Sequence, residues 1–304
     1  MLLLEQMVVL FLLMGIGFYC YKKGMITDES SKKLSAIVVN IANPAMVLTG
    51  CMGDSKIKGQ ELLQVALIII LIYVVLLGLA RVVPRILRVP EKSVGTYGAM
   101  TVFSNIGFMG FPVISALYGR EALLYASLFT IPYNVLIYTY GVSAMATDER
   151  AKKGTFSLSR VFNAGVIACI ITIIVYLLQL PVPAFVETTV THLSNLTAPL
   201  SMMVIGASLA TINIKRLFMD VKLLMFSVIK LIIIPIIGVL IIRQFVANDI
   251  ICGVCMVMLA TPVGSMTAML AQQYDGDYEM ASKGVALTTV LSVATMPFVA
   301  MLVG

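Results

Sequence analysis

The chain of 304 residues is 60% hydrophobic and only 12% charged, and its mean hydropathy is +1.01. Soluble domains are typically about 45–50% apolar and about 25% charged, so this composition excludes an ordinary soluble protein and predicts an integral membrane protein. The net charge of +6 does not indicate a nucleic-acid partner, because Lys and Arg are concentrated in alternating loops between apolar stretches.

In chain order, ten apolar stretches are long enough to span a bilayer, which takes about 20 residues each. They cover residues 2–21, 34–52, 62–83, 94–117, 122–145, 161–179, 190–211, 222–243, 250–272 and 280–303. The loops between them are short and leave no room for a soluble domain. We therefore expect an all-α polytopic protein that divides into residues 1–146, a short cytoplasmic linker at 147–160, and residues 161–304.

The basic residues predict the orientation of these spans. Loops after the odd-numbered spans carry Lys22, Lys23, Lys32, Lys33, Arg81, Arg85, Arg88, Lys92, Arg150, Lys152, Lys153, Arg160, Lys215, Arg216, Lys222 and Lys283. The opposite loops carry only Lys56, Lys58, Arg120 and Arg243. Because positive loops stay in the cytoplasm, we expect both termini outside, in a multi-pass plasma (inner) membrane protein.

The two halves of the chain correspond. The second span contains Asn40 followed four residues later by Pro44, and the seventh contains Asn195 and Pro199, so the prolines are 155 residues apart. Five spans per half is an odd number, which places the second half upside down relative to the first. This 5+5 inverted repeat is typical of several secondary transporters.

Spans 4 and 9 are interrupted in the same way. Residues 103–112 and 259–267 mix Gly, Pro and small polar residues at mid-span. Lipid offers no hydrogen bonds to free backbone groups, so such segments survive only where protein buries them or a cavity hydrates them. A pair of interruptions at corresponding places is the best indication of a substrate site in a transporter sequence.

In the first interruption, Ser104 and Asn105 precede Gly107, Gly110 and Pro112. Pro112 leaves the carbonyl group of residue 108 without its helical donor. A break here frees N–H groups whose dipole attracts anions, and the Asn105 amide can donate to a carboxylate. The alternative is a kinked helix in which Asn105 bonds to a neighbouring backbone group.

In the second interruption, Pro262 and Gly264 favour a true break over a bend. Thr261, Ser265 and Thr267 are candidate polar ligands for a substrate. Hydroxyl groups of this kind also bond back to carbonyls of their own helix, so a purely structural role is the alternative.

Three further residues in the spans are candidates for the substrate site. Lys230 lies within span 8, where a charge is costly and needs a partner. The carbonyl of Leu231, which Pro235 leaves free, is one candidate partner, and extension toward the cytoplasm is the alternative. Lys230 could also balance the C-terminal ends of the half-helices. Tyr133 and Tyr138 lie in span 5, where aromatic packing is the alternative role.

No Asp or Glu falls at the centre of a predicted span, which disfavours cation coupling through a carboxylate. The sequence shows no catalytic set, phosphate-binding loop or cluster of metal ligands, so we expect no enzyme activity, no cofactor and no metal. Cys252 and Cys255 are read as small apolar residues.

The segments 104–105, 110–112 and 116–119, together with 261–264 and 271–274, resemble the auxin efflux carrier family, and the similarity extends over essentially the whole chain. The family includes plant auxin exporters and bacterial permeases assigned to malate or malonate. The resemblance implies a scaffold part (spans 1, 2, 6 and 7), a transport part (spans 3–5 and 8–10), crossing breaks in spans 4 and 9, and a homodimer.

By the same resemblance, Asn105 matches the asparagine that contacts the substrate carboxylate in the plant carriers, and Pro112 matches their first crossover proline. Tyr138 matches a tyrosine near the substrate, and Tyr133 stands in place of a glutamine. Thr267 replaces the second crossover proline, and the long hydrophilic loop of many plant carriers is missing.

These features together predict a secondary transporter of small organic anions, either carboxylates such as malate or malonate or an aromatic monocarboxylate, that works by elevator-type alternating access. Its partners would be the anion, the lipid bilayer and a second copy of the chain, with no nucleic acid. The competing hypotheses are a sodium- or proton-coupled transporter of the same fold superfamily, and a membrane receptor or channel.

Overall fold

The computed structural model describes residues 2–52, 59–145, 162–211 and 217–303. Within these ranges the chain is helical, and the only β-structure is one isolated antiparallel bridge. The expected linker at 147–160 lies outside the described residues.

The helices of the first half follow one another with short connections. They are α1 (Leu2–Lys22), α2 (Asp28–Ile37), η1 (Val38–Ala42), α3 (Asn43–Thr49), α4 (Gly59–Ile86), α5 (Glu91–Val102), η2 (Ile106–Gly110), α6 (Phe111–Tyr118), α7 (Ala122–Ser127), α8 (Thr130–Leu136), η3 (Ile137–Gly141) and α9 (Val142–Met145). The η segments are single turns of π-helix, wider than the α-helices they join.

The helices of the second half are α12 (Ala164–Leu177), α13 (Ala184–Asn195), α14 (Thr197–Ala210), α16 (Val221–Val228), η4 (Ile229–Ile233), α17 (Ile234–Ile242), α18 (Asp249–Ala260), α19 (Ser265–Gln273) and α20 (Tyr278–Val303). As in the first half, a π-helical turn lies inside an otherwise α-helical run, here between α16 and α17.

Three of the four π-helical turns immediately precede a proline. Pro44, Pro112 and Pro235 each stand at the start of the α-helix that follows η1, η2 and η4. Proline cannot donate to the carbonyl four residues back and crowds it. A wider turn just before the ring relieves that conflict, so these prolines bend the helical run without ending it.

In the part of the chain that the structure describes, five helical runs are long and apolar enough to cross a membrane: Gln60–Ile86, Ala122–Met145, Ala184–Ala210, Val221–Ile242 and Tyr278–Leu302. Shorter apolar helices cover Val8–Lys22, Ile106–Tyr118, Ala164–Leu177 and Asp249–Ala260. The protein is thus an all-helical, multi-pass membrane protein, and the ten-span inverted repeat stays a prediction.

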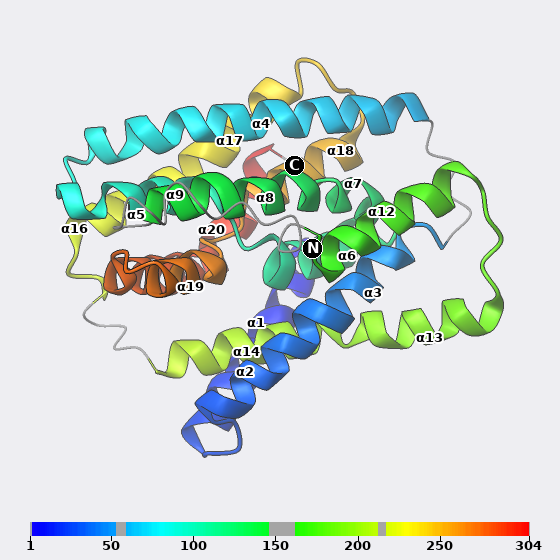
Figure 1. Ribbon diagram of the computed structural model, residues 1–304, viewed down its shortest axis with the longest axis horizontal. Coiled ribbons are helices and arrows are strands. Elements are labelled where there is room, and N and C mark those ends of the chain that lie inside the picture. Colours follow the sequence, from blue (N-terminus) through cyan, green and yellow to red (C-terminus); the bar gives the residue numbers. More distant parts are fainter. Residues whose placement is uncertain (1, 53–58, 146–161, 212–216, 304) are drawn as a thin grey trace.

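Large apolar side chains on the outer faces of these helices are exposed, as expected of surfaces that contact lipid. The helix α4 is the clearest case, with Leu63, Leu67, Ile70, Leu71, Val74, Val75, Val82 and Ile86 exposed along its length. In Figure 1, α4 runs along the upper side of the molecule, whereas α13 and α14 lie on the lower side and the hairpin of α1 and α2 extends below them. The helices α5, α6, α18 and α19 lie between these two sides in this view.

The most extensive helix contacts form two sets, which α1 also joins by packing on α20. In one set, α1 packs along α14, and α3 packs against α12 and α13. In the other, α4 packs against α5, α17 against α18, and α19 and α17 against α20. The segment η2 contacts both sets, because it packs on α14 and η1 as well as on α18.

Glycine makes the contact between α1 and α14 unusually close. A Cβ atom on Gly17 would overlap the backbone of Met203, and one on Gly206 would overlap the carbonyl oxygen of Met14. Gly15 has open space instead, with no atom within 4 Å of such a Cβ. Small residues at these positions let the two helix backbones touch, which is a common basis of helix association in membranes.

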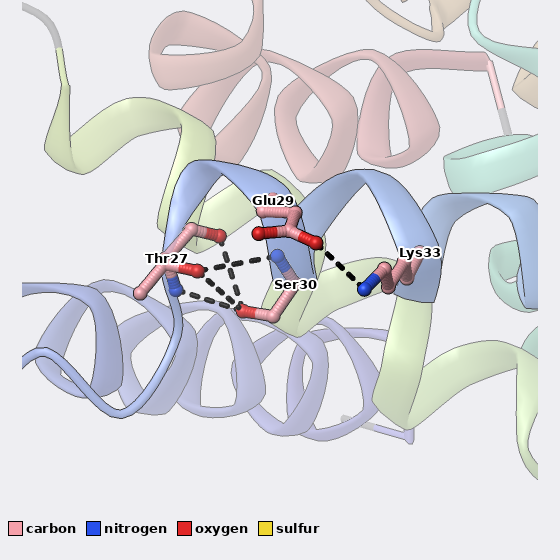
Figure 2. A network of polar contacts seen from close by, with 4 residues as sticks. All are labelled: Thr27, Glu29, Ser30 and Lys33. Atoms are coloured by element: carbon pink, nitrogen blue, oxygen red, sulfur yellow. Dashed lines mark hydrogen bonds and ion pairs between the residues drawn. The ribbon is translucent and has the colours of Figure 1, made fainter.

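The start of α2 is fixed by a reciprocal cap, shown in Figure 2. Thr27 Oγ1 accepts a hydrogen bond from the Ser30 N–H (3.2 Å), and Ser30 Oγ accepts one from the Thr27 N–H (2.8 Å). Lys33 pairs with Glu29 one turn apart, at 2.7 Å. The cap sets the point where the chain turns from the loop after α1 into the next apolar run, whereas the exposed ion pair contributes little.

Candidate functional site

The two interrupted segments meet. Helix α5 ends at Val102 and helical structure resumes at Ile106, while α18 ends at Ala260 and α19 begins at Ser265. Between them, Ser104 and Val263 form the antiparallel bridge. We call residues 103–105 and 261–264 together the crossover.

Two backbone hydrogen bonds hold the crossover together. The Asn105 N–H donates to the Pro262 carbonyl at 2.7 Å, and the Gly264 N–H donates to the Phe103 carbonyl at 2.9 Å. Each interruption therefore supplies the partners that the other has lost from its own helix. This pairing explains how non-helical backbone is accommodated in the interior of a membrane protein.

Asn105 caps the helical run that follows it. Its side-chain Oδ1 accepts a hydrogen bond from the Phe108 N–H at 3.2 Å, and its carbonyl accepts from the Gly110 N–H at 3.0 Å. Asparagine is among the best residues at such a position, because its short side chain reaches the free N–H groups of the first turn. The structure gives its Nδ2 group no partner among the described residues, although the residue is only 6% exposed. The crossover therefore holds one free amide donor at a helix N-terminus.

The second interruption contributes a second helix N-terminus. Helix α19 begins directly after Gly264, which has no side chain to cap it, and Ser265 there is half-buried. Thr261 Oγ1 donates to the Met258 carbonyl at 2.9 Å, so this hydroxyl occupies the acceptor that Pro262 leaves free. Thr267 lies inside α19, fully buried, and its hydroxyl has no hydrogen-bond partner.

Lys230 lies in η4 with its side chain fully buried. Its Nζ donates to the Ser104 hydroxyl at 2.6 Å and to the Thr101 carbonyl at 3.1 Å. In a continuous helix the Thr101 carbonyl would accept from the Asn105 N–H, but that group donates to the crossover partner instead. Lys230 therefore supplies the donor that the Thr101 carbonyl loses at the interruption, and it offsets the negative end of the α5 dipole.

This placement corrects one expectation from the sequence. The sequence left two candidates for Lys230: a bond to the carbonyl of Leu231, or extension toward the cytoplasm. The ammonium group instead bonds to Thr101 and Ser104, and its 0% exposure excludes extension to the surface. The acceptors come from the other half of the chain, about which the local sequence around Lys230 says nothing.

Aromatic residues close the crossover on another side. The Tyr133 ring meets the Phe103 ring edge-on with centroids 5.6 Å apart. A Cβ atom on Gly264 would lie 3.2 Å from the Tyr133 hydroxyl oxygen and 3.0 Å from the Ser104 carbonyl oxygen, so a larger residue there would require its neighbours to shift. Tyr138 lies further along the same run, in η3, and is half-buried.

The remaining glycine and proline candidates lie just outside the crossover. Gly107 and Gly110 are within η2, and Pro112 stands at the start of α6, in regular helix. A Cβ on Gly110 would lie 3.2 Å from the sulfur atom of Met258. Gly110 therefore allows close approach of α18, whereas Gly107 faces Asn43 of α3, and the non-helical residues themselves come before both glycines.

One contact at the crossover was missed from the sequence. The Val263 N–H donates to Thr288 Oγ1 at 3.0 Å, and Thr288 is fully buried in α20. The signal that could have found it is the offset of 155 residues in the expected repeat, which would pair Thr288 with the candidate Tyr133; both residues lie against the second interruption.

A small cavity adjoins the crossover. It is lined by Ile72, Tyr73, Leu76, Val102, Ser104, Ile106, Phe129, Met258 and Leu259. Its volume of about 10 Å³ has room for about one water molecule. A carboxylate with several heavy atoms does not fit there without movement of the surrounding helices.

Comparison with known proteins places the chain in a family. Residues 2–300 match the membrane transport protein family. An uncharacterized transporter of Methanocaldococcus jannaschii is 23% identical over 296 residues, which cover 95% of each chain. A second uncharacterized transporter, of Methanothermobacter thermautotrophicus, is 24% identical over 297 residues and 96% of each chain.

A third relative has a substrate in its name. A putative malonate transporter of Rhizobium meliloti is 24% identical over 206 residues, which cover 66% of this chain and 64% of that protein. With the family match extending over nearly the whole sequence, the chain belongs to the membrane transport protein family, also called the auxin efflux carrier family, and is a membrane transporter, not an enzyme.

Proposed function

We propose that this transporter carries small organic anions and binds them at the crossover. The observation that carries the proposal is the pairing of the two interruptions, with the free amide of Asn105 on one side and the buried ammonium group of Lys230 on the other. The relative named as a putative malonate transporter supports a carboxylate as substrate.

The electrostatics of the crossover favour an anion. Two helical runs begin there, η2–α6 and α19, and helix N-termini carry partial positive charge. The opposing C-terminal end of α5 is offset by Lys230. The acceptors of Lys230 are both uncharged, so its positive charge is not cancelled by a bonded carboxylate.

Each candidate residue then has a role. Asn105 donates to the carboxylate, Ser265 and the first N–H groups of α19 complete its coordination, and the unpaired hydroxyl of Thr267 supplies a further donor. Ser104 links the site to Lys230, Thr261 fixes the end of α18, and Tyr133 and Tyr138 form the apolar wall.

In this proposal the architecture is a ten-span 5+5 inverted repeat, in which α5–α6 and α18–α19 are the two broken spans. The set of helices around α1 and α14 is the scaffold, and the set around α5, α18 and α20 moves against it in elevator-type alternating access. The two packing sets support this mechanism, because they offer two groups of helices that could move relative to each other. The protein acts as a homodimer in the plasma membrane with both termini outside.

The experiment that tests the function is transport by purified protein in liposomes. Labelled malate, malonate, lactate, citrate, indole-3-acetate and benzoate would be offered to the wild type and to Asn105→Ala. Uptake of at least one carboxylate by the wild type, greatly reduced in the variant, is the expected result. If folded wild-type protein moves no carboxylate, the proposal is wrong. Strict dependence of uptake on sodium or on a pH gradient would favour the cation-coupled alternative, and conductance far above carrier turnover would favour a channel.

A further inference from the structure

Asn43, the first residue of α3, is a buried amide without hydrogen bonds. The residue is 8% exposed, and its Oδ1 is buried with no partner. The structure gives its Nδ2 no partner among the described residues either. Buried amide groups are normally paired, so one that is not needs an explanation.

Other asparagines in the helices show what a structural amide does. Asn40, one turn earlier, donates from Nδ2 to the carbonyl of Ala36 at 2.9 Å in its own helix. Asn134 does the same to Thr130 at 2.8 Å. Asn43 makes no such bond and caps no helix. Folding alone does not account for an amide at this position.

Asn43 lies against the first turn of η2, directly after the crossover. A Cβ atom on Gly107 would lie 3.0 Å from Nδ2 of Asn43, and Gly107 is the second residue of the helical run that Asn105 caps. The contact joins the two packing sets, because α3 packs on α12 and α13 while η2 continues from α5 across the crossover. The amides of Asn43 and Asn105 therefore flank the same first turn of η2.

The chemistry of the two amides differs in one respect. Oδ1 of Asn105 is occupied by the Phe108 N–H, so only its donor is free. Asn43 has both a free donor and a free acceptor. A carboxylate satisfies donors only, since it has no hydrogen to give when ionised. The free oxygen of Asn43 can be satisfied only by a hydrogen-bond donor, such as a hydroxyl or N–H group on the ligand.

We propose that Asn43 is a second substrate-recognition residue, which accepts a hydrogen bond from a hydroxyl or N–H group that the anion carries beside its carboxylate. The inference rests on the proposed function and deepens it by naming a feature of the substrate. An anion with such a donor satisfies Asn43 and Asn105 together, whereas an unsubstituted analogue leaves the Asn43 acceptor buried and unpaired. A site with a buried acceptor discriminates strongly against a ligand that lacks the matching donor.

The test uses pairs of anions that differ only in one hydroxyl group: malate with succinate, and lactate with propionate. Their Kd values for purified protein in detergent would be measured by calorimetry for the wild type, Asn43→Leu and Asn43→Ala. In the wild type, the hydroxy acid of at least one pair binds about tenfold more tightly than its partner. In both variants this ratio falls to about one, while the unsubstituted anion binds within about threefold of its wild-type Kd.

Asn40→Ala is the matched control, because Asn40 lies one turn away on the same run and bonds only to its own helix. It should leave the ratio unchanged. A wild-type ratio near one for every pair that binds overturns the inference while leaving the anion transporter intact. If none of these carboxylates binds, the proposed function itself has failed for this substrate class.

A structural role for Asn43 predicts another outcome. The variants would then lose thermal stability, and the hydroxyl ratio of the remaining folded protein would stay at its wild-type value, which also overturns the inference. Should neither variant fold, Gly107→Ala provides a second route, because its Cβ crowds Nδ2 at 3.0 Å and displaces the Asn43 amide. Loss of the ratio in that variant supports the inference, and an unchanged ratio contradicts it.

Discussion

Replacing Asn105 by Ala should separate substrate binding from folding, because the two roles of this side chain have different magnitudes. As a helix cap, Asn105 accepts one hydrogen bond from Phe108, and the loss of such a cap costs about 1 kcal/mol of stability. As a donor to a bound carboxylate, it makes a hydrogen bond to a charged group, worth about 1.5–3 kcal/mol. Affinity should therefore fall about 10- to 150-fold.

Ligand-induced stabilisation gives a direct assay for this difference. At a ligand concentration of about 100 times Kd, the wild type gains about 2.7 kcal/mol of apparent stability. If Kd rises about 30-fold in Asn105→Ala, the same concentration yields about 0.9 kcal/mol. The measurement is the thermal unfolding midpoint of the detergent-purified protein with and without the best carboxylate of the panel.

The control is Asn248→Ala. Asn248 caps α18 through hydrogen bonds from Ile250 (3.0 Å) and Ile251 (3.3 Å), at the end of that helix away from the crossover. It should lose similar intrinsic stability and retain the full ligand shift. If both variants keep the wild-type ligand shift, Asn105 does not hold the carboxylate and the reasoning from the crossover geometry is refuted.

Three further changes test other parts of the structure. Gly17→Ala forces a methyl group into the backbone of α14 and should lower the free energy of unfolding by about 1–3 kcal/mol. Gly15→Ala on the same helix has open space around the new methyl group and should leave the stability unchanged. Equal unfolding midpoints of the two variants would contradict the close packing of α1 and α14. Thr288→Val leaves the N–H group of the bridge without its acceptor and should cost about 1–3 kcal/mol, while Thr289→Val, whose hydroxyl bonds only to its own helix, should cost less than about 1 kcal/mol. Lys230→Met removes two charge-assisted hydrogen bonds but also the dehydration cost of the ammonium group, so the free energy of unfolding should change by about 2 kcal/mol or less. The affinity for the carboxylate should fall at least about tenfold. Unaltered affinity in calorimetry would exclude an electrostatic role for Lys230.

The membrane class and the family could be predicted from the sequence, because composition and motifs are carried by the chain itself. The detailed contacts at the crossover could not. The sequence predicted the region of the break from Gly107, Gly110 and Pro112. The non-helical residues are instead 103–105, and Pro112 lies in regular helix. The interruption is set by hydrogen bonds to residues 262–264, more than 150 positions away, and not by the local helix breakers alone.

The same limit explains the partners of Lys230 and the role of Asn43. The acceptors of Lys230 are Thr101 at the end of α5 and Ser104 in the crossover. Asn43 lies against Gly107, which has no side chain that could indicate a polar contact in the sequence. A single sequence shows that a buried charge or amide needs a partner but not which distant segment provides it. The 155-residue offset of the expected repeat is the one sequence pattern in which we saw a relation between the halves, and it would pair Tyr133 with Thr288.

The bridge between Ser104 and Val263 also has a consequence for biogenesis. The polar backbone groups of Phe103 and Asn105 have their partners on Gly264 and Pro262, which are synthesised more than 150 residues later. Until those residues arrive, the first interruption has an N–H and a carbonyl group that lipid cannot satisfy. The first half of the chain is therefore expected to reach its final structure only after the second interruption has been inserted beside it.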